Sequence, residues 1–199
     1  MTSAEQREAA RQFYQKWANK GKEDEDDRSY WIDILARVMG VEDVTDHIEF
    51  QKKVIVDGNT KRIDAYIPET RVLIEQKSLG IALDKKIHQS GGIELTPYEQ
   101  AKRYNDNLPF DEKARWIVTS NFAEIWIYDM NARVPEPVKL EINDLQAQYS
   151  LLDFLIDREA KRVNLEMEIS LQAGELVGRI YDAFLKQYKD PESPETLKS

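Results

Sequence analysis

The sequence contains no cysteine and only two histidines among its 199 residues. Disulfide bonds and thiolate metal sites are therefore excluded. Long apolar runs are also missing, because no stretch approaches the roughly 20 residues that a membrane-spanning helix needs. Residues 1–8 are polar and mixed in charge, which is not the pattern of a secretory signal. From these absences we expect a cytoplasmic protein that does not associate with a membrane.

The chain is also short of positive charge. Its formal net charge of −9 disfavours a dedicated nucleic-acid binder, because attraction to phosphate supplies most of such affinity. The charge is unevenly distributed, however. Residues 52–103 contain ten Lys or Arg and seven Asp or Glu, and they form the only basic part of an acidic chain. The sequence therefore permits contact with DNA in this segment.

The apolar periodicity predicts an α/β fold, and the length fits one domain with an appendage. Two helices at about 5–19 and 29–39 are expected on either side of a charged loop at 22–28. The remaining predicted elements are strands at 46–56, 61–67 and 71–78, a loop at 80–95, a helix at 97–107, strands at 115–120 and 123–128, and helices near 144–162 and 171–188. The expected architecture is a sandwich with a central mixed β-sheet flanked by helices, with extra helices at both ends.

Two of the predicted strands carry charges that core strands usually lack. Asp64 lies in the segment RIDAYI, and Glu75 and Lys77 lie in VLIEQKS. Side chains alternate along a strand, so Asp64 lies beside Glu75 if the two strands pair through the turn at Pro68. Adjacent carboxylates repel each other, and a divalent cation removes that penalty. Oxygen ligands without cysteine favour Mg²⁺ (or Mn²⁺) over zinc. The alternative is a surface strand with an ordinary Glu–Lys pair.

The spacing of these residues resembles the signature of the PD-(D/E)xK nuclease superfamily. Asp64 is followed after ten residues by Glu75-Gln76-Lys77, and Ile63 replaces the proline that usually precedes the aspartate. The resemblance implies a restriction-endonuclease-like sandwich in which Asp64 and Glu75 are metal ligands. The backbone carbonyl of Gln76 would be a third ligand, and Lys77 would orient or polarise the water nucleophile.

Three further residues are candidates for a supporting role or a DNA contact. By the same resemblance, Glu49 in the preceding strand would be a further ligand or a supporting base, unless it simply faces solvent. Gln100 and Tyr104 form a Gln-x3-Tyr pair on one helical face. This pair resembles the helix that follows the catalytic strand of RecB-like nucleases, where it supports the site or touches DNA. Residues 80–95 would be an ordered DNA-contacting loop or a disordered insertion.

A longer sequence segment around the motif, at about residues 12–130, resembles the N-terminal domain of MmeI-like type IIG restriction–modification enzymes. The matching residues are Tyr30-Trp31, Leu35, Glu49, Arg62-Ile63-Asp64, the segment 73–78 and Leu83-Asp84-Lys85. In that family one polypeptide joins an endonuclease, a helical connector and an adenine-specific DNA methyltransferase. The resemblance implies a nuclease-like domain at residues 1–142 and the start of the connector at 143–199. Because the sequence contains no methyltransferase motif, that domain would be covalently linked in a longer protein.

The leading hypothesis is a Mg²⁺-dependent DNA endonuclease domain that hydrolyses phosphodiesters and leaves a 5′-phosphate and a 3′-hydroxyl. With its acidic charge, the isolated domain is expected to cut DNA weakly or not at all. Nucleases of this class often need two domains for a double-strand break, so a transient homodimer is also implied. Two alternatives remain at this point. One is a non-catalytic scaffold or DNA-positioning module beside an adenine methyltransferase, and the other is a RecB-like exonuclease subunit.

Overall fold

The computed structural model describes residues 1–89, 92–156, 174, 176–181, 183 and 184. The chain divides into two compact units, Met1–Arg158 and Glu159–Ser199. The described residues of the second unit are helical, in agreement with the helix predicted at 171–188, and the other positions of that prediction lie outside the described residues. In the first unit, residues between Leu145 and Leu155 pack in the core, so this unit continues past the predicted boundary at residue 142.

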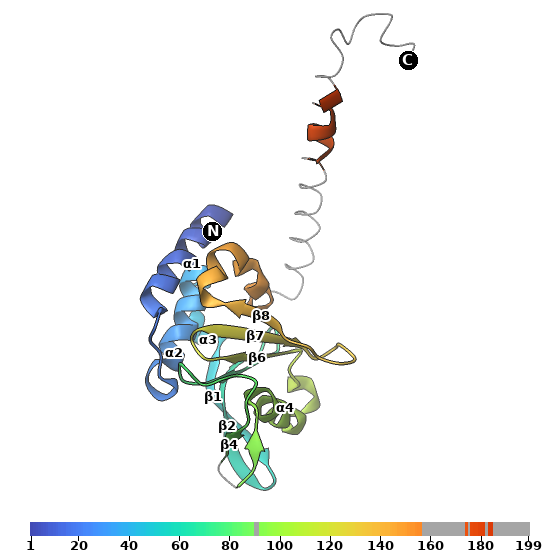
Figure 1. The fold of residues 1–199 in the computed structure, drawn as a ribbon. Helices are drawn as coiled ribbons and strands as arrows, with labels where there is room; N and C mark the ends of the chain where they lie inside the picture. Colours follow the sequence, from blue (N-terminus) through green and yellow to red (C-terminus); the bar gives the residue numbers. More distant parts are fainter. Residues whose placement is uncertain (90–91, 157–173, 175, 182, 185–199) are drawn as a thin grey trace, which may run out of the picture. The chain divides into compact units, whose positions relative to one another are not determined.

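A six-stranded mixed sheet forms the centre of the first unit (Figure 1). Its strands run in the order β1-β2-β3-β6-β7-β8, and β3 and β6 are parallel whereas the other neighbours are antiparallel. The strands are β1 (Glu49–Val56), β2 (Asn59–Ile67), β3 (Val72–Gln76), β6 (Trp116–Ser120), β7 (Glu124–Asp129) and β8 (Val138–Glu141). The predicted α/β fold, with a central mixed sheet flanked by helices, is confirmed.

Helices cover both faces of this sheet, and each face has its own apolar core (Figure 1). The core of one face contains buried side chains of α1 (Ser3–Trp17), α2 (Glu23–Asp33), the π-helical η1 (Ile34–Val38) and α3 (Val44–His47). The other core is closed by α4 (Pro97–Asn107). Thr96 caps α4 in a reciprocal capping box with Glu99, so this helix begins where the sequence predicts.

The second helix begins earlier than the sequence predicts. The charged segment 22–28 is not a loop, because α2 starts at Glu23 and runs through most of it. Four acidic residues occupy the first turn of α2, where carboxylates interact favourably with the positive end of the helix dipole. The backbone N–H of Lys22 also donates to Asp26 Oδ2 at 2.9 Å. Ser29, where the sequence places the start of the second helix, is therefore an interior residue of α2.

The strands differ from the prediction mainly at their ends. The first begins at Glu49 and not at residue 46, because α3 occupies Val44–His47. β1 and β2 are joined by a hairpin turn, in which Asp57 and Gly58 have positive φ angles of 51° and 75°. These values suit a two-residue turn of type I′. Strand β8 was not predicted, because two nearby prolines indicated irregular chain.

Two loop regions also depart from the prediction. Within residues 80–95, β4 (Ile87–His88) and β5 (Glu94–Leu95) pair as a small antiparallel sheet, so the described part of this loop carries secondary structure. The single helix predicted at 144–162 is replaced by short pieces. These are η3 (Ile142–Asp144), α5 (Leu145–Gln148) and η4 (Tyr149–Leu155), and residues 157–162 lie outside the described residues.

Candidate metal centre

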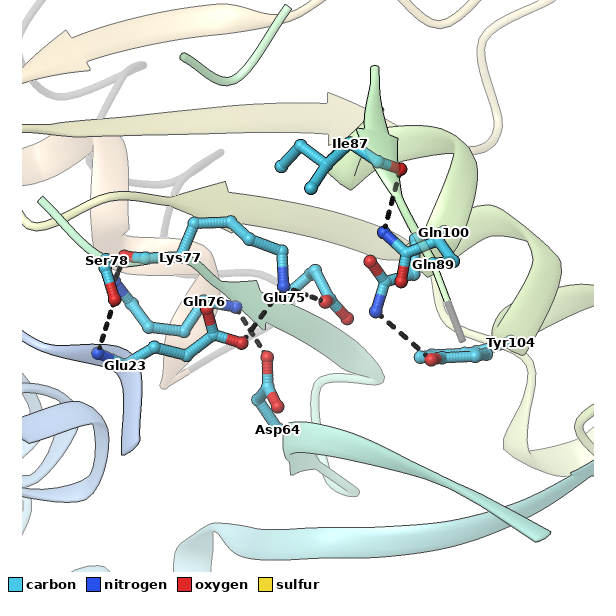
Figure 2. A network of polar contacts seen from close by, with 10 residues as sticks. All are labelled: Glu23, Asp64, Glu75, Gln76, Lys77, Ser78, Ile87, Gln89, Gln100 and Tyr104. Carbon is cyan, nitrogen blue, oxygen red and sulfur yellow. Dashed lines mark hydrogen bonds and ion pairs between the residues drawn. The ribbon is translucent and has the colours of Figure 1, made fainter. Parts of the chain in front are cut away.

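Asp64 and Glu75 face each other where β2 and β3 begin to separate. The antiparallel ladder ends with the pair Ala65↔Ile74, and the next residues along are Asp64 and Glu75. Carboxylate oxygens of Asp64, Glu75 and Glu23 all lie within 4.8 Å of one another (Figure 2). The structure thus brings the two acidic residues of the sequence motif together and adds a third from α2. We call Glu23, Asp64 and Glu75 the acidic triad.

A local irregularity of β1 leaves Asp64 without a partner in the β1–β2 ladder. The β1–β2 pairs Phe50↔Ala65 and Lys52↔Ile63 lie on either side of it, and Gln51 between them has a φ of 59°. In place of a ladder hydrogen bond, the carboxylate of Asp64 accepts the backbone N–H of Gln76 at 2.8 Å. Asp64 is therefore joined to β3 by its side chain, just beyond the last backbone pair of the β2–β3 ladder.

Glu75 is an unusually placed carboxylate, with only 1% of its surface exposed. Burial, together with the negative charge of Asp64, raises the pKa of Glu75 to about 8. One of its oxygens, Oε1, accepts from Lys77 Nζ at 2.7 Å. The other, Oε2, is buried and has no hydrogen-bond partner among the described residues. A buried acceptor without a partner is costly, so this oxygen is a natural ligand for a cation.

Asp64 is half-buried at the edge of the same group. Burial raises its pKa to about 6, although the positive charge of Lys77 and the hydrogen bond from Gln76 act in the opposite direction. Both carboxyls of the motif therefore bind protons more tightly than usual in the protein without metal. Burial is the main cause for both groups, and neighbouring carboxylates add to it.

Lys77 supplies the positive charge of the site. Its side chain is buried, and Nζ lies 2.7 Å from Glu75 Oε1 and 3.1 Å from Glu23 Oε1 (Figure 2). Burial by itself lowers the pKa of Lys77, but the charges of Glu75 and Glu23 outweigh this effect and raise it. Lys77 therefore remains protonated and carries its charge at the centre of the acidic triad.

Glu23 was missed by the sequence analysis. It lies 41 residues before Asp64 in a run of charges, where it has no strand alternation or motif spacing to distinguish it. The only local signal is that Glu23 follows Gly21, a helix-stop residue, and so stands at the start of the next helix. Such a position does not by itself indicate that the side chain reaches a distant strand.

The side chain of Gln76 serves the core and not the acidic triad. It is fully buried, and its Oε1 accepts from Trp31 Nε1 at 2.9 Å while its Nε2 donates to the backbone carbonyl of Lys77 at 3.0 Å. Only the main chain of Gln76 faces Asp64. A role of its backbone carbonyl as a metal ligand therefore stays a prediction, and so do the catalytic roles of Asp64, Glu75 and Lys77.

The three supporting candidates are placed differently. Glu49 is exposed at the start of β1, pairs with Lys52 at 3.1 Å and is not part of the acidic triad. This position agrees with the alternative that Glu49 simply faces solvent. Gln100 and Tyr104 are both largely buried on α4, and Gln100 Nε2 donates to the Tyr104 hydroxyl at 3.1 Å (Figure 2). Burial, followed by the negative charge of Glu75, raises the pKa of Tyr104, which places its hydroxyl in the electrostatic field of the site.

An open groove of about 880 Å³ gives access to the acidic triad through Asp64 and Glu23. One side of the groove is the acidic first half of α2, and Arg28 and Arg62 are the basic residues that line it. The groove can admit an extended ligand. Its many carboxylates attract cations and repel a bare phosphate chain, unless a bound cation offsets their charge.

The donor set fits a hard divalent cation. It consists of three carboxylates at short mutual distance, one of them fully buried with an oxygen to spare, and it contains no sulfur or imidazole. Oxygen-only sites of this kind suit Mg²⁺ and Mn²⁺. Glu23, Asp64 and Glu75 are the residues that would hold the ion.

Together these features define an α/β domain whose mixed sheet presents a carboxylate–lysine cluster to an open groove. A family model described as "MmeI, N-terminal domain" matches residues 8–187 of this chain. The chain belongs to the MmeI N-terminal domain family, and this membership identifies a region of a type IIG restriction–modification enzyme and implies interaction with DNA. Comparison with curated proteins and with solved structures finds no match. None of the helices in the described ranges is both long and apolar enough to cross a lipid bilayer.

Proposed function

We propose that this domain is a Mg²⁺-dependent DNA endonuclease of the PD-(D/E)xK type. The observation that carries the proposal is the convergence of the acidic triad and Lys77, in which Glu75 Oε2 is buried beside two other carboxylates and has no hydrogen-bond partner in the described part of the chain. An acidic triad that served only stability would be a poor choice, because burying like charges destabilises the folded state. Family membership supports DNA as the substrate.

The chain's own residues would divide the work of phosphodiester hydrolysis. Glu23, Asp64 and Glu75 would hold Mg²⁺, which when bound acts as a Lewis acid toward the charge that develops on the phosphate. Lys77, whose Nζ is protonated and lies 2.7 Å from Glu75 Oε1, would supply a positive charge near the water that attacks in line with the leaving 3′-oxygen. The backbone N–H of Gln76 donates to the Asp64 carboxylate and so fixes its orientation. The products would be a 5′-phosphate and a 3′-hydroxyl.

The wider protein is also part of the proposal. Because the family joins this kind of domain to an adenine-specific DNA methyltransferase, we expect such a domain to be covalently linked to residues 1–199 in the full-length protein. A transient homodimer would allow both DNA strands to be cut. The reading frame that encodes this chain can be examined for the methyltransferase motifs, and their absence would favour a free-standing nuclease.

Asp64→Ala is expected to abolish specific Mn²⁺ binding, because it removes one of the three carboxylates and leaves Glu75 bound mainly to Lys77. Titration calorimetry of the 199-residue chain with Mn²⁺ measures the effect. Glu49→Ala is the matched control, since it removes an exposed carboxylate that is not part of the acidic triad. An equal response of wild type and Asp64→Ala would contradict the nuclease proposal and favour the non-catalytic scaffold.

Mn²⁺ affinity is expected to rise with pH. Because the pKa of Asp64 is raised to about 6 and that of Glu75 to about 8, the metal must displace protons at lower pH. Each displaced proton changes the apparent affinity by up to about tenfold per pH unit. Titrations from about pH 5.5 to about pH 8.5 should show a steady rise that levels off above about pH 8.

The same pKa shifts predict the opposite trend for stability without metal. Between about pH 4 and about pH 8 the folded protein holds more protons on these carboxyls than the unfolded chain does. The free energy of unfolding therefore contains a contribution that is complete below this range and is lost as the pH rises through it. For the metal titrations described above, a Mn²⁺ affinity that does not change with pH would show that these carboxyls are not the ligands.

A further inference from the structure

The helix that carries Glu23 is capped by a residue that lies two positions after the end of β3. The first N–H groups of a helix have no partner within the helix and are usually satisfied by a nearby side chain. In α2 the N-cap residue is Lys22, whose side chain makes no capping hydrogen bond in the part of the chain that the structure describes. The backbone N–H of Glu23 instead donates to the hydroxyl of Ser78 at 3.0 Å (Figure 2). Ser78 directly follows Lys77 in the sequence.

A second contact fixes the chain just before this helix. The backbone N–H of Leu79 donates to the carbonyl of Gly21 at 3.0 Å. Gly21 has a φ of 145°, and a Cβ built on it would lie 2.1 Å from Cγ of the buried Phe122 ring. Glycine is therefore required here, both for its conformation and for its lack of a side chain. Residues 21–23 are held between Phe122 and the residues that follow the motif.

These contacts determine where the carboxylate of Glu23 lies. Its backbone is bound to Ser78, and its side chain reaches 3.1 Å from Lys77 Nζ and joins the acidic triad. We infer that Ser78 is a positioning residue of the cation site, whose hydroxyl holds the first turn of α2 so that Glu23 meets Asp64 and Glu75. This inference rests on the proposed function, because it assumes that the acidic triad binds a divalent cation.

Three variants of the 199-residue chain test the role of the hydroxyl. Ser78→Ala is expected to weaken Mn²⁺ binding about fivefold to tenfold, because the first turn of α2 loses its cap and Glu23 is no longer held in place. Ser78→Thr keeps a hydroxyl and should bind Mn²⁺ nearly as wild type does. Ser29→Ala is the matched control, since Ser29 is an exposed serine on the same helix.

A double-mutant cycle separates positioning from a general loss of stability. If Ser78 acts through Glu23, then Ser78→Ala should have no further effect on Mn²⁺ affinity in a Glu23→Gln background. In the metal-free protein, amide hydrogen exchange at Glu23 should also be faster in Ser78→Ala and not in Ser29→Ala.

Two results would overturn the inference while leaving the nuclease proposal intact. One is wild-type Mn²⁺ affinity in folded Ser78→Ala, and the other is a loss of affinity that simply adds to that of Glu23→Gln. In both cases Asp64→Ala would still abolish binding. If wild type binds Mn²⁺ no better than Asp64→Ala, the proposed function fails, and the role of Ser78 in a cation site fails with it.

Discussion

Lys77→Ala is expected to lower the rate of Mn²⁺-dependent DNA cleavage by about 10² or more, without weakening Mn²⁺ binding. The ammonium of Lys77 contacts both Glu75 and Glu23. Its removal takes away the charge that faces the attacking water and the phosphate. The carboxylates remain, and they lose a cation that competes with the metal, so Mn²⁺ affinity should stay the same or increase.

Nicking of supercoiled plasmid at low ionic strength, with the protein in excess, measures this effect. Low salt is needed because a net charge of −9 weakens encounter with DNA. Lys52→Ala is the matched control. The side chain of Lys52, on β1, is also largely buried and forms ion pairs with two glutamates, Glu49 and Glu112. Cleavage by Lys77→Ala within about threefold of wild type would remove Lys77 from the mechanism.

Trp31→Phe is expected to lower the free energy of unfolding by about 2–4 kcal/mol. Trp31 is the largest fully buried side chain, and its indole N–H donates to Gln76 Oε1 at 2.9 Å. Phenylalanine leaves a small cavity and a buried amide oxygen without a donor. Because Trp31 lies on α2 and Gln76 on β3, the substitution also weakens the attachment of the helix that carries Glu23. Urea denaturation measures the change.

The control for this prediction is the same substitution at a less demanding position. Trp126 donates its indole N–H to Glu124 Oε2 at 2.6 Å, but Glu124 is partly exposed and can bind water instead. Trp126→Phe should therefore cost about 1 kcal/mol. If Trp31→Phe proved no more destabilising than Trp126→Phe, the hydrogen bond from Trp31 to Gln76 would not be important for holding α2 on β3.

The strand part of the site could be predicted because its geometry is local. Asp64 and Glu75 are charges within apolar strands joined by a short turn, and strand alternation is enough to place them side by side. Lys77 follows from the same alternation. The alternation predicts where these residues lie and not what they do. Their roles are inferred from the resemblance, and the substitutions described above test them.

The helical part of the site could not be predicted, because it depends on tertiary contacts. Glu23 reaches the acidic triad only because Ser78 and the Gly21–Phe122 contact fix the start of α2. A run of seven charged residues favours the prediction of a solvated loop. In the structure most of this run is helical, because acidic residues stabilise the first turn of α2. Strand β8 was missed for a similar reason, since Pro137 immediately precedes it and, as an edge strand, it pairs only with β7.

The most direct test of the central claim is the position of Mn²⁺ in crystals of the chain, located by its anomalous scattering. We predict one Mn²⁺ ion between the carboxylates of Glu23, Asp64 and Glu75, bound directly by their oxygens. Glu75 Oε2 should be one of its ligands, and the ion should be lost in Asp64→Ala. Crystals in which Mn²⁺ binds elsewhere while Lys77 still bridges Glu75 and Glu23 would contradict the account.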